Sequence, residues 1–101
     1  MLAMFSITPL DKGESVSEWV ARVLDLVDQS GLDYQVTPMA TIVEGEFDLV
    51  MALVSACHKK MREHSRRVIT TIKIDDREGA KDMLSKKIES VEGRLGRELK
   101  K

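Results

Sequence analysis

Hydroxyl side chains recur at strand-like positions along this chain of 101 residues. A hydroxyl group both donates and accepts hydrogen bonds, so strands that bring several of them together can line a small pocket with polar recognition points. The alternative is purely structural, because threonine is favoured in strands whether or not it touches a ligand. The positions concerned are Ser6, Thr8, Thr37, Thr41, Thr70 and Thr71.

Two further side chains lie among or just after these hydroxyls. Met39 carries a polarizable sulfur that can lie against a flat ring, although a strand methionine more often fills a gap in the core. Glu44 shares a strand with Ile42 and is a candidate to accept hydrogen bonds from a ligand. The acids that follow, Glu46 and Asp48, are explained by the dipole of the helix they begin.

Metal binding and catalysis find little support in the sequence. Cys57 and His64 share a predicted helix face, but a zinc site needs three or four ligands and no second cluster exists. We interpret Cys57 as a small buried residue and His64 as a cation near a helix end. No base, nucleophile and orienting group occur together, so an enzyme is the least favoured class. We therefore predict no catalytic residue, metal ligand or cofactor.

The elements that must position these side chains follow from hydrophobic periodicity. Ser15 and Glu18 form a capping-box pattern at the start of the first predicted helix, which ends near Gly31. Asp75 or Asp76 is a candidate cap for the last helix. The predicted segments are a strand over 2–8, the first helix, a hairpin, a helix over 46–64, a strand over 67–75, and a helix from about Gly79. The predicted buried stripe of the helix over 46–64 is Phe47, Val50, Met51, Val54 and Met61.

The central segment 34–48 organises this pattern. Its strand formers are interrupted by Pro38, which has no backbone donor, so the sequence predicts a turn near Thr37 to Ala40. Gly45 then ends the second strand, and the apolar period changes from two to 3.6 residues at Phe47. The segment is thus a hairpin that leads into a helix.

The order strand, helix, strand, strand, helix, strand predicts an α+β, ferredoxin-like βαββαβ fold with an extra C-terminal helix. Both main helices cover one face of an antiparallel sheet, which leaves the other face open. The open face mixes apolar and hydroxyl side chains, and the last helix adds an apolar seam, so we expect a homo-oligomer. The alternative for the seam is packing within one subunit. The open face carries Met4, Ser6, Thr8, Ile69 and Thr71, and the seam carries Leu84, Ile88, Val91 and Leu95.

Length and composition limit the number of domains and the classes of partner that this protein can have. The length fits a single domain over 1–101, and 43% hydrophobic with 33% charged residues is typical of a globular protein. Sixteen basic and seventeen acidic residues give a net charge of −1, which argues against nucleic-acid binding. No apolar run is long enough to cross a membrane. The single cysteine fits a reducing compartment, so we expect a cytoplasmic protein with no membrane partner.

Three segments of the chain resemble the YkoF-like thiamine-binding family. They are MFSITPLDKGESVSEWV near the start, YQVTPMATIVEGEFDLVM in the middle and RRVITTIKIDDREG near the end, and together the resemblance runs from about Met4 to about Leu95. It implies a ferredoxin-like fold and non-catalytic binding of thiamine or its hydroxymethylpyrimidine half. It also suggests a dimer, or a tetramer made of two dimers.

The resemblance gives the candidate side chains a ligand. Hydroxyl groups would read the edges of an aminopyrimidine, Met39 would lie against its ring, and Glu44 would bond a ring nitrogen or offset the positive thiazolium. Thr37 and Thr41 belong to the central segment that carries the resemblance. The alternative is an oligomeric interaction or regulatory module with no small-molecule ligand. The predicted ligand-binding residues are Ser6, Thr8, Thr37, Met39, Thr41 and Glu44.

Overall fold

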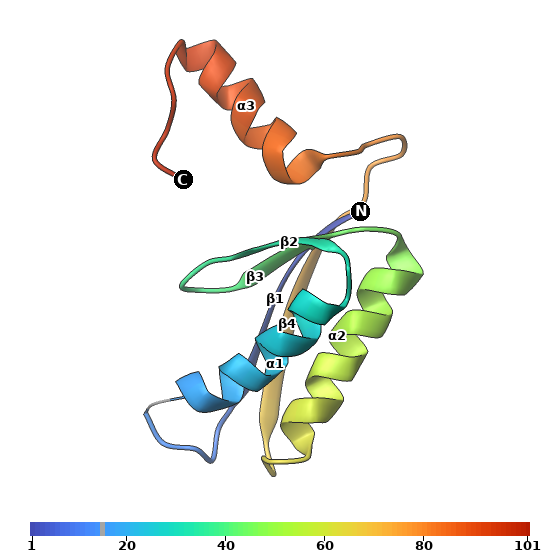
Figure 1. Cartoon of the computed structure of the whole chain (residues 1–101), viewed down its shortest axis with the longest axis vertical. Helices are drawn as coiled ribbons and strands as arrows, with labels where there is room; N and C mark the ends of the chain where they lie inside the picture. The colour runs from blue at the N-terminus through green and yellow to red at the C-terminus, as the bar shows by residue number, and fades with distance from the viewer. Residues whose placement is uncertain (15) are drawn as a thin grey trace.

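The computed structural model describes residues 1–14 and 16–101 of the chain. Within those residues, the chain forms four strands and three helices, with β2 and β3 consecutive (Figure 1). The order and bounds are β1 Leu2–Pro9, α1 Ser17–Gln29, β2 Asp33–Val36, β3 Thr41–Glu44, α2 Phe47–Arg62, β4 Val68–Asp75 and α3 Met83–Leu95.

The strands form one antiparallel sheet in the order β2-β3-β1-β4. β1 pairs with β4 along its whole length, whereas it pairs with β3 only from Leu2 to Phe5. Helices α1 and α2 lie side by side on one face of this sheet (Figure 1). The arrangement is the ferredoxin-like α+β fold that the sequence predicts, with α3 added after β4. The second half of β1 therefore has a strand neighbour on one edge only.

The core lies between the sheet and these two helices. In β1, the alternation predicted from the sequence is confirmed, because Ala3, Phe5 and Ile7 are buried while Met4 and Thr8 are exposed. Apolar side chains from α1, α2 and β3 complete the layer, as expected when one face of a sheet is covered. They are Val23, Val27, Val43, Val50, Leu53, Val54, Cys57 and Met61.

The buried stripe of α2 differs from the predicted one. Phe47 was expected in the core but is 51% exposed, and Met51 is only half-buried. Leu53 and Cys57 are buried in their place. Two overlapping stripes at helical spacing exist on this helix, and the periodicity does not say which one faces the sheet. The helix is rotated so that the stripe passing through Leu53 and Cys57 packs inward.

The start of α1 falls partly outside the described residues, because the predicted capping residue Ser15 is not among them. The helix begins at Ser17 and ends at Gln29, close to the predicted end at Gly31. None of the helices in the described chain combines the length and the apolar character that a membrane crossing needs.

The connection from β4 to α3 corrects two predictions. α3 begins at Met83, not near Gly79, since the backbone takes positive φ angles of 75° at Gly79 and 55° at Asp82 before the helix starts. Neither Asp75 nor Asp76 caps the helix. The Asp75 carboxylate instead accepts a hydrogen bond from Lys87, and the first N–H groups of α3 donate to a side chain from β3.

Helix α3 stands apart from the rest of the molecule. It lies beyond the end of the sheet, away from α1 and α2 (Figure 1), and contacts only β2 and β3 closely. It has no buried residue, and Val91 and Leu95 in its apolar seam are 48% and 50% exposed. The molecule is consequently elongated, with extents of 47 × 29 × 20 Å.

Candidate functional site

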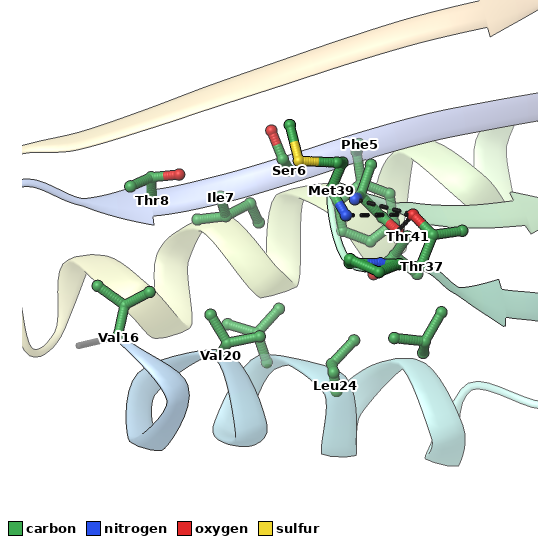
Figure 2. A pocket seen from close by; sticks show the side chains of 14 residues that line it. Phe5, Ser6, Ile7, Thr8, Val16, Val20, Leu24, Thr37, Met39 and Thr41 are labelled. Atoms are coloured by element: carbon green, nitrogen blue, oxygen red, sulfur yellow. Dashed lines mark hydrogen bonds between the residues drawn. The ribbon is translucent and has the colours of Figure 1, made fainter. Parts of the chain in front are cut away.

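A cavity of about 200 Å³ lies beside the second half of β1, where that strand has no partner from β3. Figure 2 shows β1 above the cavity, α1 below it and the β2–β3 turn at one end. The three walls come from segments far apart in the sequence. Its lining comprises Phe5, Ser6, Ile7 and Thr8 from β1, Val16, Val20, Val23 and Leu24 from the α1 region, and Val36, Thr37, Pro38, Met39, Ala40 and Thr41 from the hairpin.

Most of the predicted ligand-binding residues meet in this cavity. The hairpin turn brings three of them beside the two from β1, although β1 and the hairpin are separated by α1 in the chain. Glu44 is not part of the lining. Thr70 and Thr71, which share the hydroxyl pattern, also lie elsewhere in β4. The five that line the cavity are Ser6, Thr8, Thr37, Met39 and Thr41.

The turn at the end of the cavity is built by Thr37. Its hydroxyl donates to the Ala40 carbonyl oxygen at 2.7 Å and accepts from the Ala40 N–H at 3.1 Å, as the dashed lines in Figure 2 mark. The Thr37 N–H also donates to the Ala40 carbonyl oxygen at 2.9 Å. Since both roles of this hydroxyl are used, Thr37 shapes the rim of the cavity. This turn confirms the prediction of a bend between Thr37 and Ala40.

The other hydroxyls of the lining are placed differently. Thr41 is only 7% exposed and opens the β3 strand opposite Phe5. In the described part of the chain, no side-chain hydrogen bond engages the hydroxyls of Ser6, Thr8 or Thr41. The Thr41 hydroxyl is therefore available to a molecule in the cavity, whereas Ser6 and Thr8 project from the face of β1 opposite Phe5 and Ile7, and Figure 2 shows the Ser6 hydroxyl directed away from α1. Met39 is 87% exposed at the rim and is not part of the core. Its side chain can therefore fold over an occupant without disturbing the packing of the core.

The cavity carries no charged side chain among the residues that line it. Its floor is apolar, with Val20 and Leu24 of α1 facing β1 across the space (Figure 2). A charged group buried here would lose its hydration without gaining an ionic partner, which costs several kcal/mol by the usual order of magnitude. The site is therefore suited to a small, flat, uncharged group.

Residues of α1 that line the cavity were missed by the sequence analysis. Val20 and Leu24 of α1, and Val16 just before the helix, lie on the side that faces the hairpin, next to the buried Val23 and Val27. The available signal was the width of the apolar surface. Val20 and Leu24 extend the apolar surface of α1 beyond the buried Val23 and Val27, and such a wide apolar surface is a usable indication of a second contact.

Glu44 has a structural partner instead of a place in the cavity. Its carboxylate oxygens accept hydrogen bonds from the Met83 N–H at 2.8 Å and from the Leu84 N–H at 3.1 Å. These are the first backbone donors of α3, which have no partner within the helix. A carboxylate at this position also complements the helix dipole. Glu44 thus anchors α3 to the end of β3.

Cys57 is a core residue, as the sequence analysis suggested. Its side chain is fully buried, and its thiol donates weakly to the Val23 carbonyl oxygen at 3.8 Å. Burial raises the pKa of this thiol to about 11, so it stays protonated at neutral pH. Over residues 1–14 and 16–101, no three His, Cys, Asp or Glu side chains are grouped to hold a metal ion.

The two histidines are engaged with neighbouring side chains. His58 Nδ1 lies 2.6 Å from Thr70 Oγ1. His64 was predicted to act as a cation near the end of α2, and its Nε2 lies 3.3 Å from Arg22 Nη1. Its ring lies 5.3 Å from that of Trp19. His64 therefore packs against side chains of α1 near the end of α2.

Comparison with known proteins agrees with this architecture. A family model described as thiamine-binding protein matches residues 3–92. The UPF0045 protein of Mycobacterium bovis is 38% identical over 93 residues, covering 91% of each chain. The UPF0045 protein YqgV of Bacillus subtilis is 40% identical over 86 residues, covering 80% of this chain and 83% of the relative.

Solved structures give the same fold. The hypothetical protein MJ1052 of Methanocaldococcus jannaschii superposes with a TM-score of 0.84 at 28% identity, over 89% of this chain and 93% of the other. The family model spans nearly every strand and helix that builds the cavity, and the two sequence relatives exceed the identity expected of chance similarity over most of their lengths. The chain therefore belongs to the thiamine-binding protein family.

Proposed function

We propose that this protein is a non-catalytic binding protein for thiamine or its hydroxymethylpyrimidine half, and that the pyrimidine ring occupies the cavity beside β1. The observation that carries the proposal is the convergence of Ser6, Thr8, Thr37, Met39 and Thr41 on one cavity. These residues come from β1 and the hairpin; the pattern of hydroxyls and the sulfur of Met39 make them candidates, and Thr37 and Thr41 belong to the central segment of the resemblance. The family description supports the same ligand class.

The size of the cavity favours the pyrimidine half over the complete vitamin. An apolar cavity of about 150 Å³ is enough to hold benzene. A cavity of about 200 Å³ accordingly holds one six-membered ring with small substituents. In this proposal the thiazolium ring of thiamine extends past Met39 at the rim into solvent.

The charges of the possible ligands also favour burial of the pyrimidine half. The thiazolium is a cation and the phosphate esters of thiamine are anions, and the residues of the lining offer neither a partner. The neutral pyrimidine is the half that can be buried without an ionic partner. We therefore expect hydroxymethylpyrimidine to bind at least as well as its phosphates.

The lining also supports a binding role without catalysis. Its polar side chains are hydroxyls, and none of its residues is a histidine, cysteine, lysine or carboxylate that would serve as a base or activate a nucleophile. The histidines and the cysteine are engaged elsewhere in the fold.

Isothermal titration calorimetry and thermal unfolding test the proposal with hydroxymethylpyrimidine and thiamine. Ligand at one hundred times its dissociation constant should stabilise the protein by about 2.7 kcal/mol. Thr41→Val keeps the shape of the side chain but removes a hydroxyl from the lining, so it should weaken binding. Thr71→Val is the matched control, because Thr71 lies exposed on β4 outside the cavity. Absence of any heat or stabilisation at millimolar ligand would refute the proposal.

A second proposal concerns assembly as a homo-oligomer, either a dimer or a pair of dimers. The supporting observation is apolar exposure on the sheet face opposite α1 and α2, where Met4 is 40% and Ile69 is 49% exposed. The seam of α3 exposes Val91 and Leu95 as well. Association through these surfaces is also what the alternative role, an interaction module without a ligand, requires. Native mass spectrometry distinguishes the two roles, since it reports both the subunit number and any retained small molecule.

A further inference from the structure

The hydrogen-bond pattern of β1 leaves one pair of backbone groups free beside the cavity. At the start of the sheet, the Gly45 N–H donates to the Met1 carbonyl oxygen at 3.0 Å, and the Met1 amino group donates to the Gly45 carbonyl oxygen at 2.9 Å. In an antiparallel pair, bonded residues alternate along each strand. Ala3 and Phe5 consequently direct their backbone groups at β3, opposite Val43 and Thr41.

The opposite edge of β1 confirms this alternation. Leu10 donates its N–H to the Arg67 carbonyl oxygen at 2.9 Å, in continuation of the register that places Thr8 opposite Ile69. Even-numbered residues of β1 thus bond to β4, and odd-numbered residues face the β3 side. Ile7 is the first odd-numbered residue after β3 pairing stops at Phe5.

The residue that would pair with Ile7 on the β3 side does not face it. Continuing the register of β1 and β3 would place Met39 opposite Ile7, but the chain is already in the hairpin turn there. The Met39 N–H is directed at Thr37 Oγ1, at 3.4 Å. No described residue forms a hydrogen bond with the Ile7 N–H or carbonyl on that edge. Ile7 itself is only 7% exposed and lines the cavity.

We infer that the backbone of Ile7 recognises the ligand through two hydrogen bonds. Its N–H donates to an acceptor on the edge of a heterocycle, and its carbonyl oxygen accepts from an adjacent donor on the same edge. The inference rests on the proposed function and specifies how the same cavity selects its ligand. A 4-aminopyrimidine has this edge, because its ring nitrogen N3 accepts while the adjacent amino group donates. Each bond satisfies a backbone group that otherwise lies nearly buried without a protein partner.

A small ring suits this edge better than a peptide strand. An added strand needs a row of alternating donors and acceptors. After Ile7, the next residue on this edge is Pro9, which has no N–H. The turn of the hairpin closes the other end of the space at Thr37. The Ile7 N–H is therefore the last backbone donor on this edge, and together with the Ile7 carbonyl oxygen it matches a single amidine-like group.

The test uses the ¹⁵N-labelled full chain, hydroxymethylpyrimidine, and the same compound without its 4-amino group. In the free protein, the Ile7 amide should exchange with solvent at least about tenfold faster than those of Ser6 and Thr8, which bond to β4. Hydroxymethylpyrimidine should shift the Ile7 amide resonance and slow its exchange. The compound without the amino group should bind about tenfold more weakly, the usual effect of losing one hydrogen bond.

Ile7→Pro provides a test in the chain itself. It removes the N–H and breaks no bond of the ladder, although the smaller core side chain lowers stability, and affinity in the folded variant should fall by about tenfold. Ile69→Val, on the open sheet face outside the cavity lining, is the control and should bind like the wild type. If Ile7→Pro does not fold, the exchange and analogue measurements on the wild type still decide the matter.

The outcomes separate the inference from the proposed function. If hydroxymethylpyrimidine shifts the amides of Thr37 to Thr41 while the Ile7 amide is unchanged and the analogue binds equally well, the inference is wrong and the proposed function stands. Slow exchange of the Ile7 amide in the free protein would also overturn the inference, since that edge would then be paired. If millimolar ligand shifts no amide at all, both fail.

Discussion

The two ends of the β2–β3 hairpin differ in what they build. At the turn end, Thr37 bonds within its own four-residue segment and forms the rim of a cavity. At the other end, Glu44 reaches a helix that begins 39 residues later in the chain and caps its first N–H groups. The turn end is thus built by local bonds and by packing against β1 and α1. The α3 end depends on two carboxylates, those of Glu44 and Asp75, and on a few half-buried side chains.

The two ends of the hairpin also differ in how deeply their surroundings are buried. The cavity lies beside the core that β1, α1 and α2 share, so its walls are held by residues such as Val23 that are almost fully buried. The apolar seam of α3 has no buried residue. We therefore expect substitutions near the cavity side of the fold to change global stability, and substitutions in α3 to change local structure or assembly.

The largest expected contrast is between a core residue and a seam residue. Met61 is 2% exposed under the sheet, whereas Leu95 is 50% exposed at the end of α3. Met61→Ala should lower the free energy of unfolding by about 2–5 kcal/mol through loss of buried volume. Leu95→Ala should change it by about 0.5 kcal/mol or less. Urea unfolding of the isolated variants measures both, and equal losses would show that α3 packs as tightly as the core.

Assembly provides the next contrast. Ile88 and Val91 lie in the apolar seam of α3, and Ile88→Asp combined with Val91→Asp places two charges there. If the seam lies between subunits, sedimentation should show a smaller molecular mass with the sheet domain still folded. Loss of the cooperative fold would instead mean that the seam is essential within one subunit. A wild type that sediments as a monomer at micromolar concentration would contradict the proposal of an oligomer.

Glu44 should have a smaller, local effect. Glu44→Ala removes the acceptor for the Met83 and Leu84 N–H groups, which by analogy with other helix caps costs about 0.5–2 kcal/mol. Hydrogen exchange should then accelerate along α3 and remain unchanged in α1 and α2. Glu46→Ala is the control, because Glu46 forms no side-chain cap bond on α2. A loss of pyrimidine affinity without faster exchange in α3 would return Glu44 to the binding site.

The smallest expected effect is a pH dependence in the loops at the far end of the sheet. Hydrogen bonds from Ser65, at 2.5 Å, and from the Arg66 N–H, at 3.0 Å, hold the pKa of Asp11 below its ordinary value of 3.8. A carboxyl with a lowered folded pKa stabilises the fold above the unfolded value, and this stabilisation disappears as pH falls through the folded value. Asp11→Asn should therefore be less stable than the wild type at pH 7, and the difference should shrink below pH 3.8. A constant difference in urea unfolding across that range would contradict the assignment.

Much of the fold could be predicted because local patterns and tertiary packing agree. The alternation of Ala3, Phe5 and Ile7 indicates which face of β1 is buried, Pro38 places the turn of the hairpin, and Gly45 ends β3. The rotation of α2 could not be predicted, since the stripes through Phe47 and through Leu53 have the same period. The sheet decides between them, and its surface is not visible in the helix sequence.

The candidate site was predictable in part for the same reason. Thr37 and Thr41 bracket a turn, so their proximity to each other follows from the sequence, while their position beside Ser6 and Thr8 follows from the pairing of β1 with β3. Glu44 could not be separated from them, because its bonding partners, the Met83 and Leu84 amides, are distant in sequence. The free edge at Ile7 is a property of strand register, which side-chain patterns do not reveal.

A crystal structure of the protein with hydroxymethylpyrimidine tests the central claim most directly. We expect the ring in the cavity between β1 and the hairpin, with its amino group at the Ile7 carbonyl oxygen and N3 at the Ile7 N–H. A ring bound instead on the open sheet face near Met4 and Lys73, or beside Glu44, would contradict the assignment of the site.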